Sequence, residues 1–432
     1  MSTSGPARKD PAPKGPAPKD GGEAEPPTVF GGPHGRALLT LATGVLLLWA
    51  TMMSVFPALP DIAPAIGVSA GTLGLVFAGS AVLMTALSVP AGVLSDRYGR
   101  RPLVLSGLAV STVGLVLTAA AGHSAGVFVG GWIVFGFGRG LFLSPAFTVP
   151  ADLFPPQLRG RAIGVLAGAI GIGSVVGYVG GGVLLAAGSW RTILVVDAVL
   201  IATATALTTA LLRESIRERL QTRLTVATVQ TFGWFRHRVV LLSGVVAGAA
   251  FAVGVAATFL VPFSLTALDA SPFLLAAVFV PYEVVASVGT VVTGRVSDAV
   301  GRKPPMLAVI GLLAVALAAL PLLGVSVWSI AVIYSFVGLA EGPVVSLATT
   351  MVSDEVIRLD PRRLGSALGA SRLVTGIGPI LGPVAGGLLV QHASAGTRFW
   401  VLAAVTAGTL ALGLPLRETH RPRRAQAAEV TA

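Results

Sequence analysis

The chain of 432 residues contains no cysteine and no asparagine, and only 11% of its residues are charged. The absence of cysteine excludes disulfide bonds, thiolate metal sites and cysteine nucleophiles. The absence of asparagine excludes N-glycosylation acceptors. In contrast, 54% of the residues are hydrophobic, which is more than soluble globular domains contain. The composition therefore predicts a protein whose main solvent is a lipid bilayer.

The formal net charge is +11, and charge alone would be compatible with binding to nucleic acid. The charged residues, however, fall in short clusters between apolar runs of roughly 20 residues, a length that spans a hydrocarbon core of about 30 Å. We therefore expect the lipid bilayer, and not a nucleic acid, to be the partner of this chain.

Twelve apolar runs are long enough to cross a membrane. They divide the chain into a disordered tail (1–36) rich in proline and glycine, an N-terminal six-helix bundle (37–212), a polar linker (213–238), a C-terminal six-helix bundle (239–416) and a second tail (417–432). The predicted spans lie near residues 37–59, 72–94, 102–121, 126–148, 161–187, 191–212, 239–267, 272–294, 304–323, 327–352, 364–390 and 397–416.

The positive charges are distributed unevenly between the two sides of these spans. The tails and alternate loops on one side hold 26 of the 30 lysines and arginines. Loops rich in lysine and arginine stay cytoplasmic. The distribution predicts a multi-pass protein of the cell membrane with both termini in the cytoplasm.

One short motif occurs twice. The segment GVLSDRYGRRP from Gly92 aligns with GRVSDAVGRKP from Gly294 at a constant offset of 202 residues, and each copy follows the second predicted span of its half. Internal similarity at half the chain length is typical of transporters that are built from two like bundles.

These loops resemble the signature of the major facilitator superfamily, G-x-x-x-D-[RK]-x-G-R-[RK]. The resemblance implies an all-α fold of twelve transmembrane helices in two pseudo-symmetric bundles, and a transporter of the drug or metabolite:proton antiporter type that works by alternating access. The second copy departs from the signature only at Ala299. The matching residues are Gly92, Asp96, Arg97, Gly99, Arg100 and Arg101 in the first copy, and Gly294, Asp298, Gly301, Arg302 and Lys303 in the second.

The residue types of this loop suggest individual roles. Gly92 lets a neighbouring helix approach closely, Asp96 can accept hydrogen bonds from N–H groups at a helix start, and Gly99 permits a tight turn. The arginines can pair with acidic residues of the opposing half, such as Asp354 or Glu355. The resemblance implies a conformational latch between the halves, which stabilises the outward-open state and is released for inward opening.

Four ionisable residues fall deep inside predicted spans, where each costs roughly 2.5 to 3.5 kcal/mol. The resemblance implies that their helices line a central cavity, so we expect them to bind substrate or protons, together with aromatic residues on the same helices. The alternative is that they are structural, as in a buried pair of Arg372 with Glu341 or an Arg372 that extends to the interface. Asp197 is expected to be structural. The candidate site residues are Arg139, Glu283, Glu341, Arg372, Trp132, Tyr178, Tyr282 and Tyr334.

Two helices depart from the antiporter patterns of the superfamily. The fourth span has the glycines of R-x-x-Q-G-x-G-x-G, but Trp132 stands at the arginine position; Arg139, two helical turns later, is a candidate substitute. In the fifth span Tyr178 stands where G-x-x-x-G-P-x-x-G-G has proline, whereas the eleventh span retains it. Residues expected to pack or kink helices are Gly173, Gly177, Gly181, Gly182, Gly378, Gly382, Pro383, Gly386 and Gly387.

The sequence thus favours a monomeric exporter of a drug or metabolite that needs no metal or cofactor and is driven by the proton gradient. The alternative is an importer of an anionic or zwitterionic metabolite that Arg139 and Arg372 would bind. A membrane enzyme or sensor is disfavoured, because the sequence has no nucleotide P-loop, no HExxH motif and only 5 histidines.

Overall fold

The computed structural model describes residues 29–215, 231–360 and 363–420, and all regular secondary structure in these ranges is helical. Twelve helical segments are long and apolar enough to cross a membrane, as the sequence predicts. The N-terminal half comprises α1 (Gly32–Met53), η1 (Phe56–Ala58), α2 (Leu59–Ala65), α3 (Ala70–Tyr98), α4 (Arg100–Ala119), α5 (Ala125–Leu153), α6 (Pro156–Ala187) and α7 (Trp190–Leu211). The C-terminal half comprises η2 (Trp234–Arg236), α9 (Arg238–Thr266), α10 (Pro272–Ala277), α11 (Phe279–Val300), α12 (Lys303–Leu323), α13 (Val327–Leu359), α14 (Leu364–Thr375), α15 (Ile377–His392) and α16 (Ala395–Gly413).

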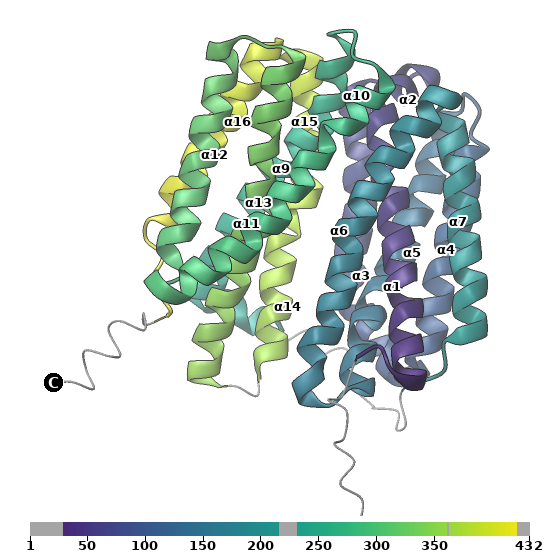
Figure 1. Cartoon of the computed structure of the whole chain (residues 1–432), viewed down its shortest axis with the longest axis vertical. Coiled ribbons are helices and arrows are strands. Elements are labelled where there is room, and N and C mark those ends of the chain that lie inside the picture. Colours follow the sequence, from purple (N-terminus) through teal and green to yellow (C-terminus); the bar gives the residue numbers. More distant parts are fainter. Residues whose placement is uncertain (1–28, 216–230, 361–362, 421–432) are drawn as a thin grey trace, which may run out of the picture.

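The two halves stand side by side as separate bundles (Figure 1). Both copies of the repeated loop lie at the same end of the molecule, where α3 meets α4 and α11 meets α12; we call this the charged end, at the bottom of Figure 1. Helix α1 begins at Gly32, inside the segment expected to be a tail. Residues 1–28, most of the linker (216–230) and residues 421–432 of the second tail lie outside the described residues.

Prolines account for the breaks within three spans. The eighth span breaks at Val278, three residues before Pro281, and the eleventh at Gly376, three residues before Pro379. A proline removes one helical hydrogen bond and its ring crowds the preceding turn. The first span likewise ends in η1 and α2, which contain Pro57, Pro60 and Pro64. Pro383, where the sequence predicts a kink, lies inside α15, and the break is one and a half to two turns earlier.

The predicted packing glycines form two ladders. Side chains on Gly173, Gly177 and Gly181 of α6 would collide with backbone carbonyls of α1, and Gly378, Gly382 and Gly386 of α15 face α9 in the same way. The remaining two glycines lie at contacts between the halves, since Gly182 contacts Ala276 of α10 and Gly387 contacts Ala70 of α3. All eight glycines therefore sit where close helix packing leaves no room for a side chain.

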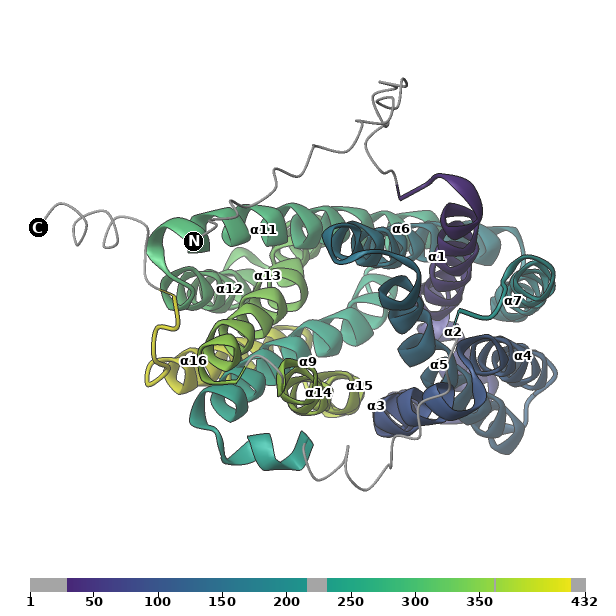
Figure 2. The same ribbon diagram turned by 90° about the horizontal axis from the view of Figure 1, so that it is seen from below.

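The halves touch away from the charged end and are apart at it (Figures 1 and 2). Helix α15 packs along α3, and α6 packs against α10 and α11. Nearer the charged end, a Cβ atom on Gly160, Gly164 or Gly168 of α6, or on Gly294 of α11, would meet nothing within 4 Å. The described conformation is therefore open toward the charged end.

Candidate functional site

The structure brings two of the predicted ionisable residues together. Glu283 on α11 and Glu341 on α13 lie close enough for their charges to interact. Glu341 packs against α9, where a Cβ atom on Gly254 would lie 3.1 Å from its Cγ. Glu283 faces the other half and lies near the hydroxyl of Ser174 on α6. The two carboxylates thus lie at the junction of the two halves.

All three predicted tyrosines surround this carboxylate pair. Tyr282 and Tyr334 stack with ring centroids 4.7 Å apart and an interplanar angle of 8°. The Tyr334 hydroxyl is 2.8 Å from that of Thr258. The Tyr282 hydroxyl is buried and lies beside the Glu341 carboxylate, with no other hydrogen-bond partner among the described residues. It is therefore a donor available to a carboxylate or a ligand.

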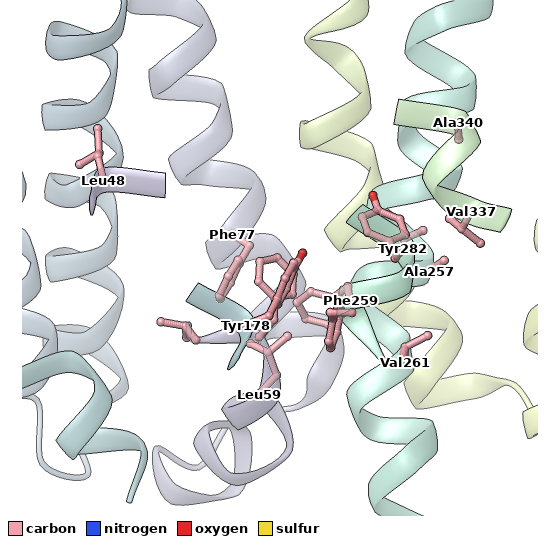
Figure 3. Packing of buried hydrophobic residues seen from close by; sticks show 14 of the residues in the cluster. Leu48, Leu59, Phe77, Tyr178, Ala257, Phe259, Val261, Tyr282, Val337 and Ala340 are labelled. Atoms are coloured by element: carbon pink, nitrogen blue, oxygen red, sulfur yellow. The ribbon is translucent and has the colours of Figure 1, made fainter. Parts of the chain in front are cut away.

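Ring contacts continue from this group across the junction (Figure 3). Tyr178 stacks on Phe279 at 4.1 Å, and Phe279 meets Tyr334 edge-on at 5.3 Å. On the other side the contacts run from Tyr178 to Phe56, Phe77 and Trp132, and Phe77 also meets Phe259 of α9. Sequence reasoning missed all four phenylalanines, because an aromatic residue in an apolar span has no pattern that separates site from core.

Arg139 lies in the N-terminal half and does not join the carboxylates. Its side chain is 4% exposed and makes no ion pair within the described residues. The guanidinium is 3.2 Å from the sulfur of Met52 and 5.5 and 5.6 Å from the rings of Trp49 and Phe135, which is cation–π geometry. Its buried Nε has no partner there. A buried cation held only by sulfur and aromatic faces can still accept an anionic partner.

Arg139 and Glu341 occupy equivalent positions, since the offset of 202 residues that relates the two loops also relates this pair. The same offset relates Trp132 to Tyr334, and Gly136, which packs on Ser80, to Gly338, which packs on Tyr282. The signal for this equivalence is in the sequence, because the loop alignment extends along the chain to these residues without a gap. One position of the repeat therefore holds a cation in one half and an anion in the other.

The other two ionisable residues stand apart from this site. Arg372 is exposed on α14, and no ion pair between Arg372 and Glu341 forms in the described conformation, so that alternative is wrong for this state. Arg372 lies one turn before Gly376, which faces Thr85 of α3, and is thus on the side of α14 toward the other half. Asp197 is buried and accepts a 2.6 Å hydrogen bond from Ser54, as expected for a structural residue.

The repeated loops form the same network twice. Arg100 binds Ser95, Asp96 and Asp152 of its own half, with Nε 3.1 Å from Asp152. Arg302 binds the residues 202 positions later, Ser297, Asp298 and Asp354, also with an Nε distance of 3.1 Å to Asp354. Although burial disfavours its charge, the hydrogen bonds to Asp298 and Asp354 raise the pKa of Arg302.

These pairings correct two expectations. Asp354 binds Arg302 and Glu355 binds Arg358, so in this conformation neither acid pairs with the arginines of the opposing half. The separation of the halves at the charged end explains this, because the loops that would meet are apart. A latch that holds the other conformation remains a prediction.

The acceptor at the helix starts is not Asp96 either. The backbone N–H groups of Arg100 and Arg101 donate to Glu214, just after α7, at 2.9 and 3.2 Å. Those of Arg302 and Lys303 donate to Glu418, after α16, at 2.8 and 3.0 Å. Carboxylates at helix N-termini satisfy donors that have no partner inside the helix. The sequence feature that could have predicted these acceptors is the Leu-Arg-Glu-Ser/Thr motif, which occurs at 212–215 and again at 416–419.

The glycines of the loops behave differently from one another. Gly99 has a φ of +108°, as a tight turn at this position requires, and Gly301 in the second copy has a φ of +101°. A Cβ atom on Gly92 would lie 3.3 Å from the Ser144 hydroxyl, whereas one on Gly294 would meet nothing within 4 Å. Arg97 is exposed, with its guanidinium 5.4 Å from the ring of Tyr98. Close approach at Gly294 would thus require another conformation.

A family model described as Major Facilitator Superfamily matches residues 41–370. The chain belongs to the major facilitator superfamily. The fold agrees, since a crystal structure of a D-xylose-proton symporter superposes with a TM-score of 0.70 at 18% identity, covering 89% of this chain and 98% of that one. A bacterial homolog of the human lysosomal transporter Spinster, solved in an inward-facing and unoccupied conformation, gives 0.69 at 17% identity, covering 88% and 94%.

Curated superfamily relatives match over shorter stretches. The methylenomycin A resistance protein of Bacillus subtilis is 26% identical over 168 residues, which cover 39% of this chain and 36% of the relative. The inner membrane transport protein YajR of Escherichia coli is 28% identical over 174 residues, covering 40% and 38%. The matches thus span little more than a third of these relatives. Family and fold together establish a multi-pass membrane protein of this superfamily, and its activity, substrate and direction of transport need a separate argument.

Proposed function

We propose that this transporter uses the proton gradient to export a small organic cation by alternating access. The observation that carries the proposal is the Glu283–Glu341 pair at the junction of the halves, enclosed by the rings of Tyr178, Tyr282 and Tyr334. Carboxylates supply the charge that a cation needs, and aromatic faces bind the cation and its apolar groups.

The coupling follows from electrostatics. Two neighbouring carboxylates repel each other when both are ionised, and a proton or a bound cation removes that repulsion. Proton and substrate would therefore compete for the same carboxylate pair, so that binding of one favours release of the other. Because Glu283 faces α6 of the N-terminal half while Glu341 packs on α9, rocking of the halves would change what surrounds the pair.

The direction rests on orientation. The sequence assigns 26 of the 30 lysines and arginines to the tails and loops of one side, which favours a cytoplasmic charged end. In that orientation both termini are cytoplasmic and the described conformation faces inward. In this arrangement substrate enters from the cytoplasm, exchanges with protons at the carboxylates and leaves across a bacterial cell membrane. The working unit in this proposal is a monomer, with no cofactor beyond the proton gradient.

A second candidate is import of an anionic or zwitterionic metabolite. Arg139 supports it, because this buried guanidinium has no acidic partner among the described residues and an anionic substrate could supply one. The two candidates differ in the sign of the charge that is recognised and in the direction of flux.

The test uses proteoliposomes with an imposed pH gradient and tetraphenylphosphonium as the cationic probe. Wild type should move the probe against its gradient, opposite to the proton flow, and Glu283→Gln or Glu341→Gln should reduce movement to that of empty liposomes while probe exchange or binding stays measurable. Asp269→Asn, which removes a carboxylate in the turn between α9 and α10, is the matched control and should pump. Gradient-driven pumping by both site variants would refute the proposal, and uptake of an anion lost only in Arg139→Gln would favour import.

A further inference from the structure

A cavity of about 290 Å³ opens at the charged end of the C-terminal half, away from the carboxylate site. It lies between the first turns of α9, the last turn of α13 and the segment after α16. Its volume is far above the roughly 15 Å³ that a single water molecule needs, so it can hold a polyatomic group. None of the interactions described for transport involves it.

Cationic and hydrogen-bonding groups dominate the polar part of this cavity. His237, Arg238 and Arg417 line it, and neither arginine has an ion pair within the described residues. Both acids in the lining are already engaged, Glu355 by Arg358 at 2.6 Å and Glu418 by the backbone at the start of α12. The cavity therefore has positive charge that its own acids do not neutralise.

Two buried polar atoms in the lining lack partners. The Nδ1 atom of His237 and the Oγ1 atom of Thr419 are shielded from solvent and make no hydrogen bond within the described ranges. His237 is also the residue at the N-terminus of α9, and its side chain does not cap the helix. The first backbone N–H groups of α9 can therefore donate hydrogen bonds to a ligand in the cavity, and such donors favour anions.

The equivalent place in the N-terminal half is built differently, although its sequence is related. Arg36 corresponds to Arg238 at the offset of 202 residues, and Ser215 corresponds to Thr419 in the repeated Leu-Arg-Glu-Ser/Thr motif. The Ser215 hydroxyl donates to Asp152 at 3.1 Å, whereas Thr419 has no such bond. Gly35 stands where the other half has His237. The two positions that hold polar atoms without partners in this cavity therefore have no counterpart of that kind in the N-terminal half, because Ser215 is bonded and Gly35 has no side chain.

We propose that this cavity binds the phosphate of an anionic phospholipid from the leaflet at the charged end. Arg238, Arg417 and the N-terminus of α9 bind the phosphate oxygens, and His237 and Thr419 donate the remaining hydrogen bonds. The position favours a lipid over free phosphate, because Val239 and Leu242 of the membrane-spanning α9 line the same cavity below its polar rim. The cavity thus extends from the polar rim into the apolar layer, as a lipid does.

The experiment measures lipid retention by the full-length protein in detergent, using native mass spectrometry with added phosphatidylglycerol. Wild type should retain one tightly bound phosphatidylglycerol, and R238Q/R417Q should bind it about tenfold more weakly, because two charge-assisted hydrogen bonds are lost. The control R161Q/R213Q, which removes the same charge from the charged end outside the cavity, should match wild type. R238K/R417K, which keeps the charge, should recover part of the affinity.

Three results would overturn the proposal. They are equal retention by R238Q/R417Q and wild type, equal retention of zwitterionic phosphatidylcholine with the same acyl chains, and displacement of the lipid by millimolar inorganic phosphate. The thermal midpoint of each variant without added lipid shows whether it is folded. If R238Q/R417Q does not fold, failure of R238K/R417K to retain the lipid while it remains folded also refutes the assignment.

Discussion

The two halves of this protein are alike at the charged end and carry opposite charges in the middle of the membrane-spanning helices. At the charged end, Arg100 and Arg302 bind equivalent partners at the same distance, and Glu214 and Glu418 cap equivalent helices. In the middle, the equivalent positions 139 and 341 hold an arginine and a glutamate. The repeat was thus retained where it supports the loops and changed where ligands are expected to bind.

The difference distinguishes residues that are needed for the fold from residues that are needed for the proposed function. The hydrogen-bond and ion-pair network of the loop needs the same geometry in both bundles, because each network holds the same turn between two helices. A binding site at the junction of two halves gains nothing from symmetry when its ligand has only one sign of charge. The aromatic rings follow the same logic, since Tyr178 and the tyrosines of α11 and α13 all surround the acidic side.

The largest expected effect tests the opposite charges directly. Glu341→Arg, which makes position 341 resemble position 139, should abolish transport of a cationic probe, because a cation then meets a like charge. Arg139→Gln, which removes the cation of the other half, should leave most of that transport intact. Initial rates in proteoliposomes, normalised to inserted protein, measure both. Equal losses in the two variants would show that both halves contribute alike.

A second prediction concerns the likeness of the loop networks. Arg100→Gln should destabilise the protein by about 1 to 3 kcal/mol, because Asp96 and Asp152 lose a partly buried charged partner. Arg302→Gln should cost less, since the side chain of Asp298 is 59% exposed and water can replace the arginine there. The stabilities of the two variants can be compared by denaturing each protein in detergent and following its intrinsic fluorescence. Arg363, whose side chain is 70% exposed and pairs with the 41% exposed Asp360, provides the control, and its change to glutamine should be nearly neutral.

The glycine ladders offer a third comparison between the halves. Gly177→Ala on α6 and Gly382→Ala on α15 should each cost about 1 to 3 kcal/mol, because the added methyl group collides with α1 or α9. Gly168→Ala, where a Cβ atom meets nothing within 4 Å, should be neutral or slightly stabilising. Thermal midpoints distinguish these cases. A stable Gly177→Ala variant would mean that α6 and α1 can separate at no cost.

The smallest expected effect concerns the helix caps. Glu214→Ala and Glu418→Ala should each lower stability by about 1 kcal/mol, because two backbone donors at a helix start lose their acceptor. The effects should be equal if the two ends are equivalent. Asp269→Asn, in the turn between α9 and α10, is a control for the loss of one surface carboxylate, because asparagine tolerates the φ of +54° at this position. A much larger loss for one glutamate would reveal a further role on that side.

Much of the architecture could be read from the chain. The apolar runs predict all twelve spans, because a helix needs about 20 apolar residues to cross the hydrocarbon core of a membrane. The regularly spaced glycines predict where helices pack closely. The break in the eleventh span was not placed correctly, since the sequence predicts a kink at Pro383 whereas the helix breaks at Gly376, three residues before Pro379.

What the sequence by itself determined was the list of ionisable residues and their helices, because charge is rare in lipid and therefore conspicuous. Which of them meet was decided by the tertiary structure. Glu283 joins Glu341 while Arg139 turns to Trp49 and Arg372 stays exposed, and Glu214 replaces Asp96 at the helix start. Such partnerships depend on the rotation of each helix and on residues that are 58 to 114 positions apart, and no local pattern in the chain contains either.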